Sequence, residues 1–402
     1  MKYLNKLNED NKLIIYFENE LNSANSEKID LEIEKIITDD KHYNDKHYND
    51  KHYNVYDLIF DFQDLKYITS AGLRVILKYK KKFDSLSIIN ACLEVYDILD
   101  MTGFTNFMKV TKALKEVDVT CCKVIGEGFF STVYRLNKDT IIKVFNRTSD
   151  AMQIERELKL AKRAFILGIP TAISFDIVKV GEKLGVRFEM LDCMSLKNCF
   201  VEDEANYDDY VNRYVKLLKK INNTLCDDNA VPYMKDAYLN KVDCLKDDLD
   251  IANYKKIRTL IEDIPDSINF IHGDCHFKNI MVQGDDYLII DMDTLSRGYY
   301  IFELASLRAS YIGYEEDEPG NCERFLGVTS EFSSKLYYDV LYNYLSEMSE
   351  ERINKAKSKI ELLSFLHMVW WTKLNEKDNE VRLNGCMNRL LNVLPKVDTL
   401  II

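Results

Sequence analysis

The sequence predicts two domains in series, an α/β domain over residues 1–113 and an α+β domain of two lobes over residues 114–402. Three observations support this prediction. The 402 residues exceed what one hydrophobic core usually supports. In the first part, short apolar runs alternate with helical patterns. The second part begins with a strand-rich stretch around a glycine-containing loop and continues as a mostly helical region.

The first domain shows the alternation of an α/β fold. Its apolar runs predict strands at 13–17, 55–60 and 86–90. Its helical patterns occur around 27–37, directly after Ser70 and near 95–99. On the helix after Ser70, Lys78 is expected to be solvated. We therefore expect a sheet backed by helices.

A perfect repeat interrupts this domain, because residues 40–54 contain the pentapeptide DKHYN three times. The repeat carries three of the six histidines, which raises the hypothesis of a metal site. It falls between the first predicted helix and the central strand, where a longer loop costs little free energy. We interpret it as a surface insertion, and its histidines are not candidate ligands.

One segment of the second domain carries residues suited to phosphoryl transfer. Residues 271–279 read IHGDCHFKN, and twelve residues later Asp291 follows in the run LIID. Phosphoryl transfer from ATP needs a carboxylate base and oxygen ligands for Mg²⁺. Asp274 is the candidate base, and Asn279 and Asp291 are the candidate Mg²⁺ ligands. Asp293 is either a further ligand or a structural carboxylate.

A matching phosphate loop stands upstream, where residues 126–133 read GEGFFSTV. Gly126 and Gly128 would let the backbone lie against the phosphates of ATP, where a side chain would intrude. Ser131 stands at the place of a third glycine, and Val133 completes the loop.

Further candidates for ATP binding follow this loop. Lys143, on the next apolar run, provides a charge for the α- and β-phosphates. We expect an acidic residue of the following helix to hold it, and Glu157 fits better than Glu155. Between the two lobes, the backbone from Glu189 to Leu191 is expected to meet adenine.

These motifs resemble the aminoglycoside phosphotransferase and choline kinase-like family, a branch of the protein kinase-like fold. Its HGDxHxxN signature, followed by Ile-Asp, is matched from His272 to Asp291. A protein kinase would carry Arg in place of Gly273. The resemblance implies two lobes, at about 118–191 and 192–402, ATP and Mg²⁺ as cofactors, and a small-molecule hydroxyl acceptor. Glu303 stands where the family has an aspartate that braces the catalytic loop.

In the first domain, residues 61–75 read DFQDLKYITSAGLRV and residues 101–104 read MTGF. Both segments resemble the STAS domain of anti-sigma factor antagonists. The resemblance implies that Ser70 is phosphorylated by a partner anti-sigma kinase, which breaks the complex. A phosphate is electrostatically favoured at a helix N-terminus, and its charge repels an apolar or acidic partner.

Composition limits the other classes of function. A formal net charge of -12 argues against a nucleic-acid partner. No secretory segment and no apolar run long enough for a membrane span is apparent, so we expect a cytoplasmic protein. The ten cysteines are scattered without a C-x-x-C pair, which favours reduced packing residues.

The sequence therefore predicts a cytoplasmic ATP-dependent phosphotransferase fused to an anti-sigma factor antagonist-like domain. Two alternatives stay open: a nucleotide-sensing regulatory protein without turnover, and a protein kinase that acts on Ser70 or on a partner. The intact set of Asp274, Asn279 and Asp291 favours catalysis. The identity of the acceptor depends on the helices after Glu202. In the predicted helix 362–373, the Trp370-Trp371 pair is interpreted as core packing rather than a pocket wall.

Overall fold

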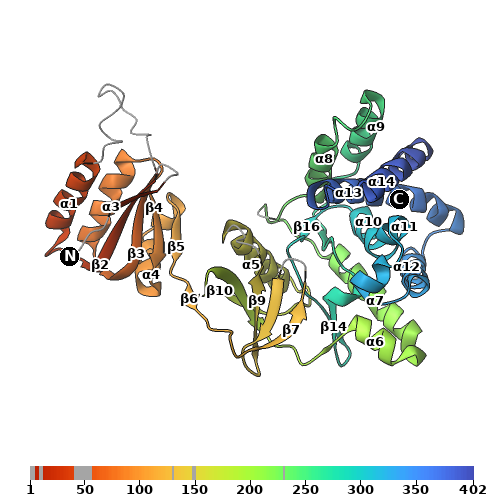
Figure 1. Ribbon diagram of the computed structural model, residues 1–402, viewed down its shortest axis with the longest axis horizontal. Coiled ribbons are helices and arrows are strands. Elements are labelled where there is room, and N and C mark those ends of the chain that lie inside the picture. The colour runs from red at the N-terminus through yellow and green to blue at the C-terminus, as the bar shows by residue number, and fades with distance from the viewer. Residues whose placement is uncertain (1–4, 9–11, 40–56, 129–130, 147–150, 230) are drawn as a thin grey trace. The chain divides into compact units, whose positions relative to one another are not determined.

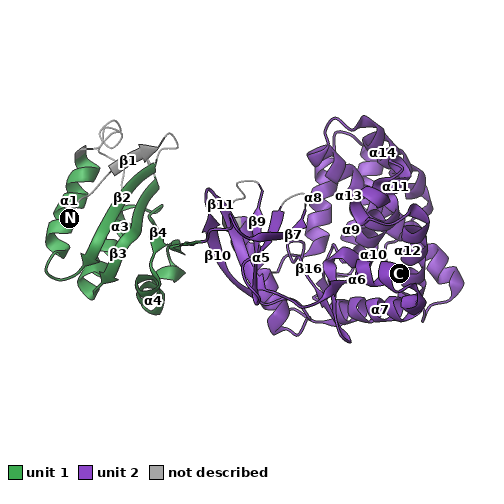
Figure 2. Cartoon of the chain, turned by 60° about the horizontal axis from the view of Figure 1, so that its bottom comes forward, with its two compact units in different colours: residues 1–116 green, residues 117–402 purple. Residues whose placement is uncertain are grey.

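The computed structural model describes residues 5–8, 12–39, 57–128, 131–146, 151–229 and 231–402. The chain divides into two compact units, residues 1–116 and 117–402 (Figure 2). This boundary lies slightly beyond the one predicted at residue 113. The repeat at 40–54 and two residues of the glycine-containing loop, Phe129 and Phe130, lie outside the described residues.

The first unit is built on a sheet in the order β1-β2-β3-β4-β5 (Figure 1). β1 is antiparallel to β2, and the other neighbours are parallel. The strands are β1 (Asn5–Asn8), β2 (Lys12–Leu21), β3 (Asp57–Ile68), β4 (Ser87–Ala91) and β5 (Val110–Lys112). β3 extends past the strand predicted at 55–60 because Leu65 and Ile68 continue its buried side.

Among the described residues of this unit, the helices that connect the strands are α1 (Ser26–Asp39), α3 (Ser70–Lys82) and α4 (Leu93–Met101). α3 approaches the sheet closely at Gly72, where a Cβ would lie 2.6 Å from the carbonyl oxygen of Leu21. Lys78, which is predicted to be solvated, has a side chain that is 35% exposed and that also forms ion pairs. Its Nζ lies 2.7 Å from Asp30 and 3.0 Å from Glu34, both on α1. The α/β prediction for this unit is confirmed.

The strand-rich lobe of the second unit has a sheet in which the neighbours follow the order β10-β11-β9-β8-β7. Its strands are β7 (Lys123–Glu127), β8 (Ser131–Arg135), β9 (Thr140–Phe145), β10 (Ser174–Val180) and β11 (Lys183–Glu189), and the short strand β6 (Lys115–Glu116) ends the first unit. One helix, α5 (Ala151–Ile166), packs against β10 and β11. Its buried side includes Ile154 and Ala164.

The helical lobe follows. Its helices are α6 (Leu196–Glu202), α7 (Tyr207–Asn223), α8 (Met234–Cys244), α9 (Ile251–Glu262), α10 (Ile301–Arg308), α11 (Tyr314–Asp317), α12 (Ser330–Tyr344), α13 (Glu350–Asn375) and α14 (Glu380–Val393). Its short strands are β12 (Met194–Ser195), β13 (Phe270–Ile271), β14 (Ile280–Gln283), β15 (Asp286–Ile289) and β16 (Ser296–Arg297). α13 begins before the predicted helix 362–373 because Ile353, Ala356 and Ile360 extend its buried side.

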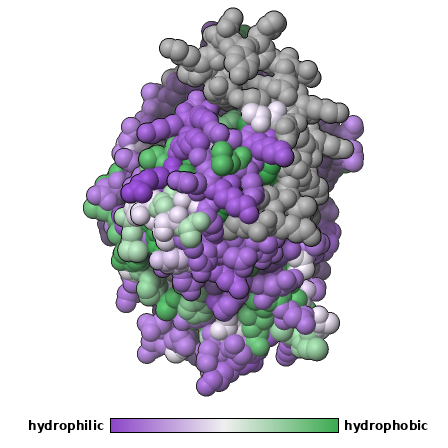
Figure 3. Space-filling view, turned by 90° about the vertical axis from the view of Figure 1, so that its left-hand side faces the viewer, coloured by the Kyte–Doolittle hydropathy of each residue, from purple (hydrophilic) through white to green (hydrophobic). Residues whose placement is uncertain are grey.

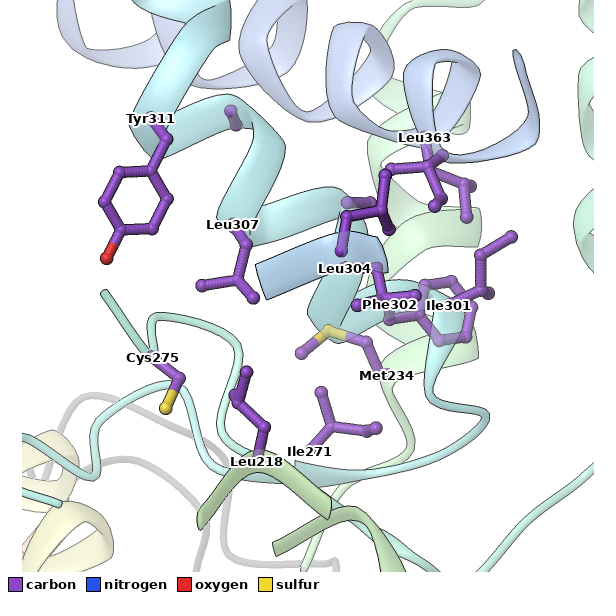
Figure 4. Packing of buried hydrophobic residues seen from close by; sticks show 14 of the residues in the cluster. Leu218, Met234, Ile271, Cys275, Ile301, Phe302, Leu304, Leu307, Tyr311 and Leu363 are labelled. Carbon is purple, nitrogen blue, oxygen red and sulfur yellow. The ribbon is translucent and has the colours of Figure 1, made fainter. Parts of the chain in front are cut away.

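The core of the helical lobe surrounds α10, all of whose residues are buried. In Figure 4, Met234 of α8 lies among Ile271, Phe302 and Leu304. The chain after Ile271 therefore leaves directly from the core. All ten cysteines are free thiols, and the prediction that they are packing residues fits the five buried ones but not Cys121 and Cys244, which are exposed.

The surface is mixed in character. Hydrophilic residues predominate on the face shown in Figure 3, with hydrophobic residues in small groups between them. Among the helices that the structure describes, none is long and apolar enough to cross a lipid bilayer.

Candidate active site

The segment that carries the candidate base turns sharply as it leaves the core. Buried β13 leads into Gly273, which has a φ of +81° that glycine adopts without strain. A Cβ at this position would lie 2.9 Å from Met234 Cε and 3.3 Å from the carbonyl oxygen of Thr294. Any side chain at this position would therefore strain the backbone and require Met234 and Thr294 to shift.

A hairpin places the two candidate Mg²⁺ ligands at the same end of β14 and β15. The backbone N–H of Ile290 donates to the carbonyl oxygen of Asn279 at 2.9 Å. Asp291 follows with a φ of +68°, a left-handed conformation that is uncommon outside glycine. Backbone strain of this kind occurs mostly at functional sites.

Asn279 also contacts the candidate base. Its Nδ2 donates to the backbone oxygen of Asp274 at 3.0 Å and to Asp274 Oδ2 at 3.1 Å. The side chain of Asp274 is 38% exposed, so a substrate hydroxyl can reach it. The amide nitrogen of Asn279 thus orients the carboxylate, while its Oδ1 has no donor among the described residues.

His272 joins the loop of the base to the strand that ends at Asp291. It is fully buried, with Nε2 at 3.2 Å from the carbonyl oxygen of Ile290. Its Nδ1 accepts the N–H of Asp274 at 3.3 Å. Burial lowers the pKa of His272 to about 4, so the ring is neutral at neutral pH and carries its proton on Nε2. A neutral imidazole therefore fixes the spacing of the two segments.

The second histidine of the motif, His276, lies beside the base. Its Nε2 is 3.5 Å from Asp274 Oδ1. Burial lowers the pKa of His276 to about 4, so this contact is not an ion pair at neutral pH. Its Nδ1 is buried without a hydrogen-bond partner in the described part of the chain.

Glu303, on α10, holds the backbone of the catalytic loop, the segment 272–279 that carries Asp274. Its Oε2 accepts the backbone N–H of His272 at 2.6 Å, and its Oε1 accepts that of Gly273 at 3.1 Å. Asn222 supports the same carboxylate with an Nδ2 at 3.4 Å. Glu303 is fully buried, and burial raises its pKa to about 7 despite these hydrogen bonds. The longer glutamate thus reaches the backbone that the family's aspartate braces.

Two tyrosines hold the other side of the loop. Tyr311 accepts the backbone N–H of Phe277 at its hydroxyl, at 2.8 Å. Tyr214, on α7, donates to the carbonyl oxygen of Cys275 and lies 3.2 Å from the hydroxyl of Tyr311. Cys275 is therefore a packing residue, as its place in the motif indicates. No local sequence pattern indicates the role of either tyrosine: Tyr214 belongs to α7, and Tyr311 belongs to the π-helical segment Ala309–Gly313 that follows α10.

Lys143, on β9, lies between two carboxylates. Its Nζ is 2.9 Å from Glu157 Oε1 and 2.6 Å from Asp291 Oδ1. Glu155 makes no such ion pair among the described residues. Burial acts to lower the pKa of Lys143, but the charges of Asp291 and Glu157 outweigh it and raise the pKa. Burial opposes ionisation of Asp291 as well, but Lys143 keeps the pKa of that carboxyl low.

The phosphate loop joins β7 to β8, and Gly128 donates its N–H to the carbonyl oxygen of Ser131 at 2.8 Å. Neither Gly126 nor Gly128 has a positive φ. A Cβ at either position would meet described atoms only at 3.6 Å or beyond, an ordinary contact distance. The described fold thus does not require these glycines, which is consistent with the close approach of a ligand. Ser131 is buried, and Val133 pairs with Lys143 across β8 and β9.

In the segment between the lobes, the side chain of Glu189 and the carbonyl oxygen of Leu191 already have partners within the protein. Glu189 ends β11, and its Oε1 accepts the N–H of Ile173 at 2.7 Å. The carbonyl oxygen of Leu191 lies 3.5 Å from the Sγ of Cys193. Contact with an adenine ring would therefore involve the backbone of this segment, and the side chain of Glu189 has a structural role.

The residues present fit a divalent cation. Desolvation and the negative charge of Asp291 raise the pKa of Asp274, and the same two causes raise that of Asp293. A bound cation would reduce the repulsion of Asp274 and Asp293 by Asp291, which the positive charge of Lys143 alone does not cancel. Asn279 and Asp291 offer oxygen atoms, and Mg²⁺ typically takes one or two protein ligands beside phosphates and water. Within the described residues, no group of three His, Cys, Asp or Glu side chains forms a metal cage.

The tryptophan pair takes part in helix packing. The ring of Trp370 lies 4.9 Å from the Nζ of Lys241, and the ring of Trp371 lies 5.7 Å from that of Tyr314. Both tryptophans are half-buried, so they pack at the edge of the helical lobe and not in its core as predicted.

The second unit has two lobes, a loop that carries the candidate base, a glycine-containing loop and a buried lysine–glutamate pair, which is the arrangement expected of a kinase-like phosphotransferase fold. The model of the phosphotransferase enzyme family matches residues 122–323, half of the chain. The chain belongs to this family. The STAS domain model matches residues 3–117, so a STAS domain precedes the phosphotransferase domain.

Solved structures are similar to each part. The ADP-bound aminoglycoside phosphotransferase APH(2″)-Ib is 13% identical, with 75% of this chain and 98% of that chain covered and a TM-score of 0.47. A choline/ethanolamine kinase family protein from Mesorhizobium loti is 12% identical, with coverages of 69% and 88% and a TM-score of 0.44. The unphosphorylated anti-sigma factor antagonist SpoIIAA is 16% identical, with coverages of 27% and 87% and a TM-score of 0.21. No curated protein matches the chain.

Proposed function

We propose that the chain transfers the terminal phosphoryl group of ATP to a hydroxyl of a small molecule, and that its STAS domain regulates this transfer. The observation that carries the proposal is the position of Asp274. Its carboxylate is partly exposed and is held by Asn279, which flanks the same hairpin end as Asp291. Base and candidate metal ligands thus converge on one place, as phosphoryl transfer requires.

Each residue has a role that follows from its contacts. Asp274 orients the acceptor hydroxyl and accepts its proton. Asn279 and Asp291 would hold Mg²⁺, which supplies charge neutralisation for the phosphates when bound. Lys143, held by Glu157, contacts the α- and β-phosphates, and the backbone at Gly126 and Gly128 lies against them.

A small-molecule acceptor is favoured over a protein acceptor by the surroundings of Gly273. Its left-handed backbone and the close approach of Met234 and Thr294 disfavour the arginine of the protein kinase signature. The sensor alternative is less favoured, because a protein that only binds nucleotide does not need an exposed carboxylate oriented by an amide.

The test is product analysis by mass spectrometry after incubation of the full chain with Mg-ATP and a panel of hydroxyl- and amine-bearing metabolites. We expect one acceptor to gain a phosphoryl group with wild-type protein and not with Asp274→Asn. Phosphate found on the protein instead of a metabolite would establish the protein kinase alternative. ATP binding without any transfer would establish the sensor alternative.

For the STAS domain we propose that Ser70 is a regulatory phosphorylation site that controls binding to an anti-sigma-type partner. Ser70 is exposed at the first position of α3, directly after the N-cap residue Thr69. Added phosphate would interact favourably with the helix N-terminus and would change the charge of the surrounding surface.

A further inference from the structure

A hollow of about 530 Å³ lies between α5 and the residues Asp228 and Val231, away from the phosphate loop. Its basic lining residues all come from α5: Arg156, Lys159, Lys162 and Arg163. Leu160 and Val231 are buried and line it with apolar atoms. The size is that of a typical small-molecule site.

The charges around the hollow are only partly compensated. Arg163 is paired, since its Nε lies 3.2 Å from Asp228 Oδ2. By contrast, Arg156, Lys159 and Lys162 make no ion pair with any carboxylate that the structure describes. The remaining acidic lining residue is Glu155. The hollow is therefore net positive in a chain whose formal net charge is -12.

We propose that this hollow binds a small organic polyanion that carries phosphate or carboxylate groups. Three cations that pair with no described carboxylate lie within two turns of one helix, and charge-assisted hydrogen bonds to an anion would use them together. The apolar atoms of Leu160 and Val231 provide a surface for the organic part of the ligand. A nucleic acid is excluded by the size of the hollow.

The position of the hollow connects it to the active site. α5 also carries Glu157, which lies next to Arg156 and holds Lys143 at 2.9 Å. The opposite wall, at Asp228 and Val231, belongs to the helical lobe. A bound polyanion would therefore contact both lobes and the helix that positions the nucleotide-binding lysine.

The test is calorimetric titration of pyrophosphate, without Mg²⁺ and at constant ionic strength, into the full chain carrying Lys143→Ala. This substitution weakens pyrophosphate binding at the phosphate loop, so that the hollow dominates the signal. A second protein adds Lys159→Gln and Lys162→Gln. A matched control adds Lys216→Gln and Lys220→Gln, which remove two exposed charges from α7.

We expect pyrophosphate to bind the Lys143→Ala protein and the α7 control equally, and the α5 variant about tenfold or more weakly. Equal affinity of the α5 variant and the α7 control would overturn the proposal, as would the absence of binding to the Lys143→Ala protein. Because no ATP and no acceptor is present, this result is independent of whether the chain transfers phosphate.

Discussion

Lys143 and Asp291 form a direct ion pair, with Nζ 2.6 Å from Oδ1. The two residues belong to different lobes and are expected to serve different parts of Mg-ATP, the lysine its phosphates and the aspartate its metal. The charge of each residue offsets that of the other. Under the proposed function, the phosphates and the cation of Mg-ATP would compete for these two side chains.

Replacement of Lys143 tests the nucleotide site. Lys143→Ala removes the cation between Glu157 and Asp291, so Mg-ATP affinity measured by calorimetry should fall by about tenfold or more. Lys138→Ala, which removes a highly exposed lysine of the same lobe, is the control and should leave affinity unchanged. Equal affinities of the two variants would contradict the assignment of Lys143.

The roles of base and metal ligand are separable. Asp274→Asn keeps the shape of the side chain and removes its charge, so turnover should fall by about 10²-fold or more while ATP affinity is retained. Asp291→Asn should reduce both turnover and Mg-ATP affinity. Steady-state kinetics and calorimetry on both variants decide the point, and wild-type turnover by Asp274→Asn would refute the proposed mechanism.

Glu303 offers a test of positioning. In Glu303→Gln, an amide nitrogen replaces one acceptor of the N–H groups of His272 and Gly273. The free energy of unfolding should fall by about 1–3 kcal/mol, the range for an unsatisfied buried group. Turnover should fall with ATP affinity retained, which a general loss of stability does not produce. Glu347→Gln, at an exposed position, is the matched control and should change neither quantity.

At Gly273, the stability cost of close neighbouring atoms can be measured separately from the cost of its left-handed backbone conformation. Gly284 has a φ of +59°, and no described atom lies within 4 Å of the place that a Cβ would take there. Gly284→Ala should therefore cost only the left-handed strain, about 1–2 kcal/mol. Gly273→Ala adds the contacts with Met234 and Thr294 and should cost at least about 1 kcal/mol more in chemical denaturation. If the free energy of unfolding falls less for Gly273→Ala than for Gly284→Ala, Met234 and Thr294 can move to accommodate the added methyl group.

Ser70 is tested through binding. Ser70→Asp should weaken the interaction with an anti-sigma-type partner, and Ser70→Ala should not, because only the former adds negative charge at the start of α3. A pull-down titration of both variants measures the effect. Identical affinities would remove the regulatory role of this serine.

Periodicity and short motifs carried the correct predictions. The helix from Ser70 and the strand predicted at 86–90 follow local patterns, and a resemblance over neighbouring residues identified the STAS and phosphotransferase folds. The contact of Lys143 with Asp291 joins residues 148 positions apart, so no local pattern indicates it. The ion pairs of Lys78 were missed for the same reason, because its partners lie on a different helix.

Side chains from distant elements order the catalytic loop, with Glu303 and the two tyrosines supplying contacts that neither β13 nor β14 provides. Local unfolding of the helical lobe would release these contacts together. On heating, loss of turnover should therefore follow the melting of helices that touch neither nucleotide nor metal. The upper temperature for activity is then set by the core around α10, even while the strand-rich lobe remains folded.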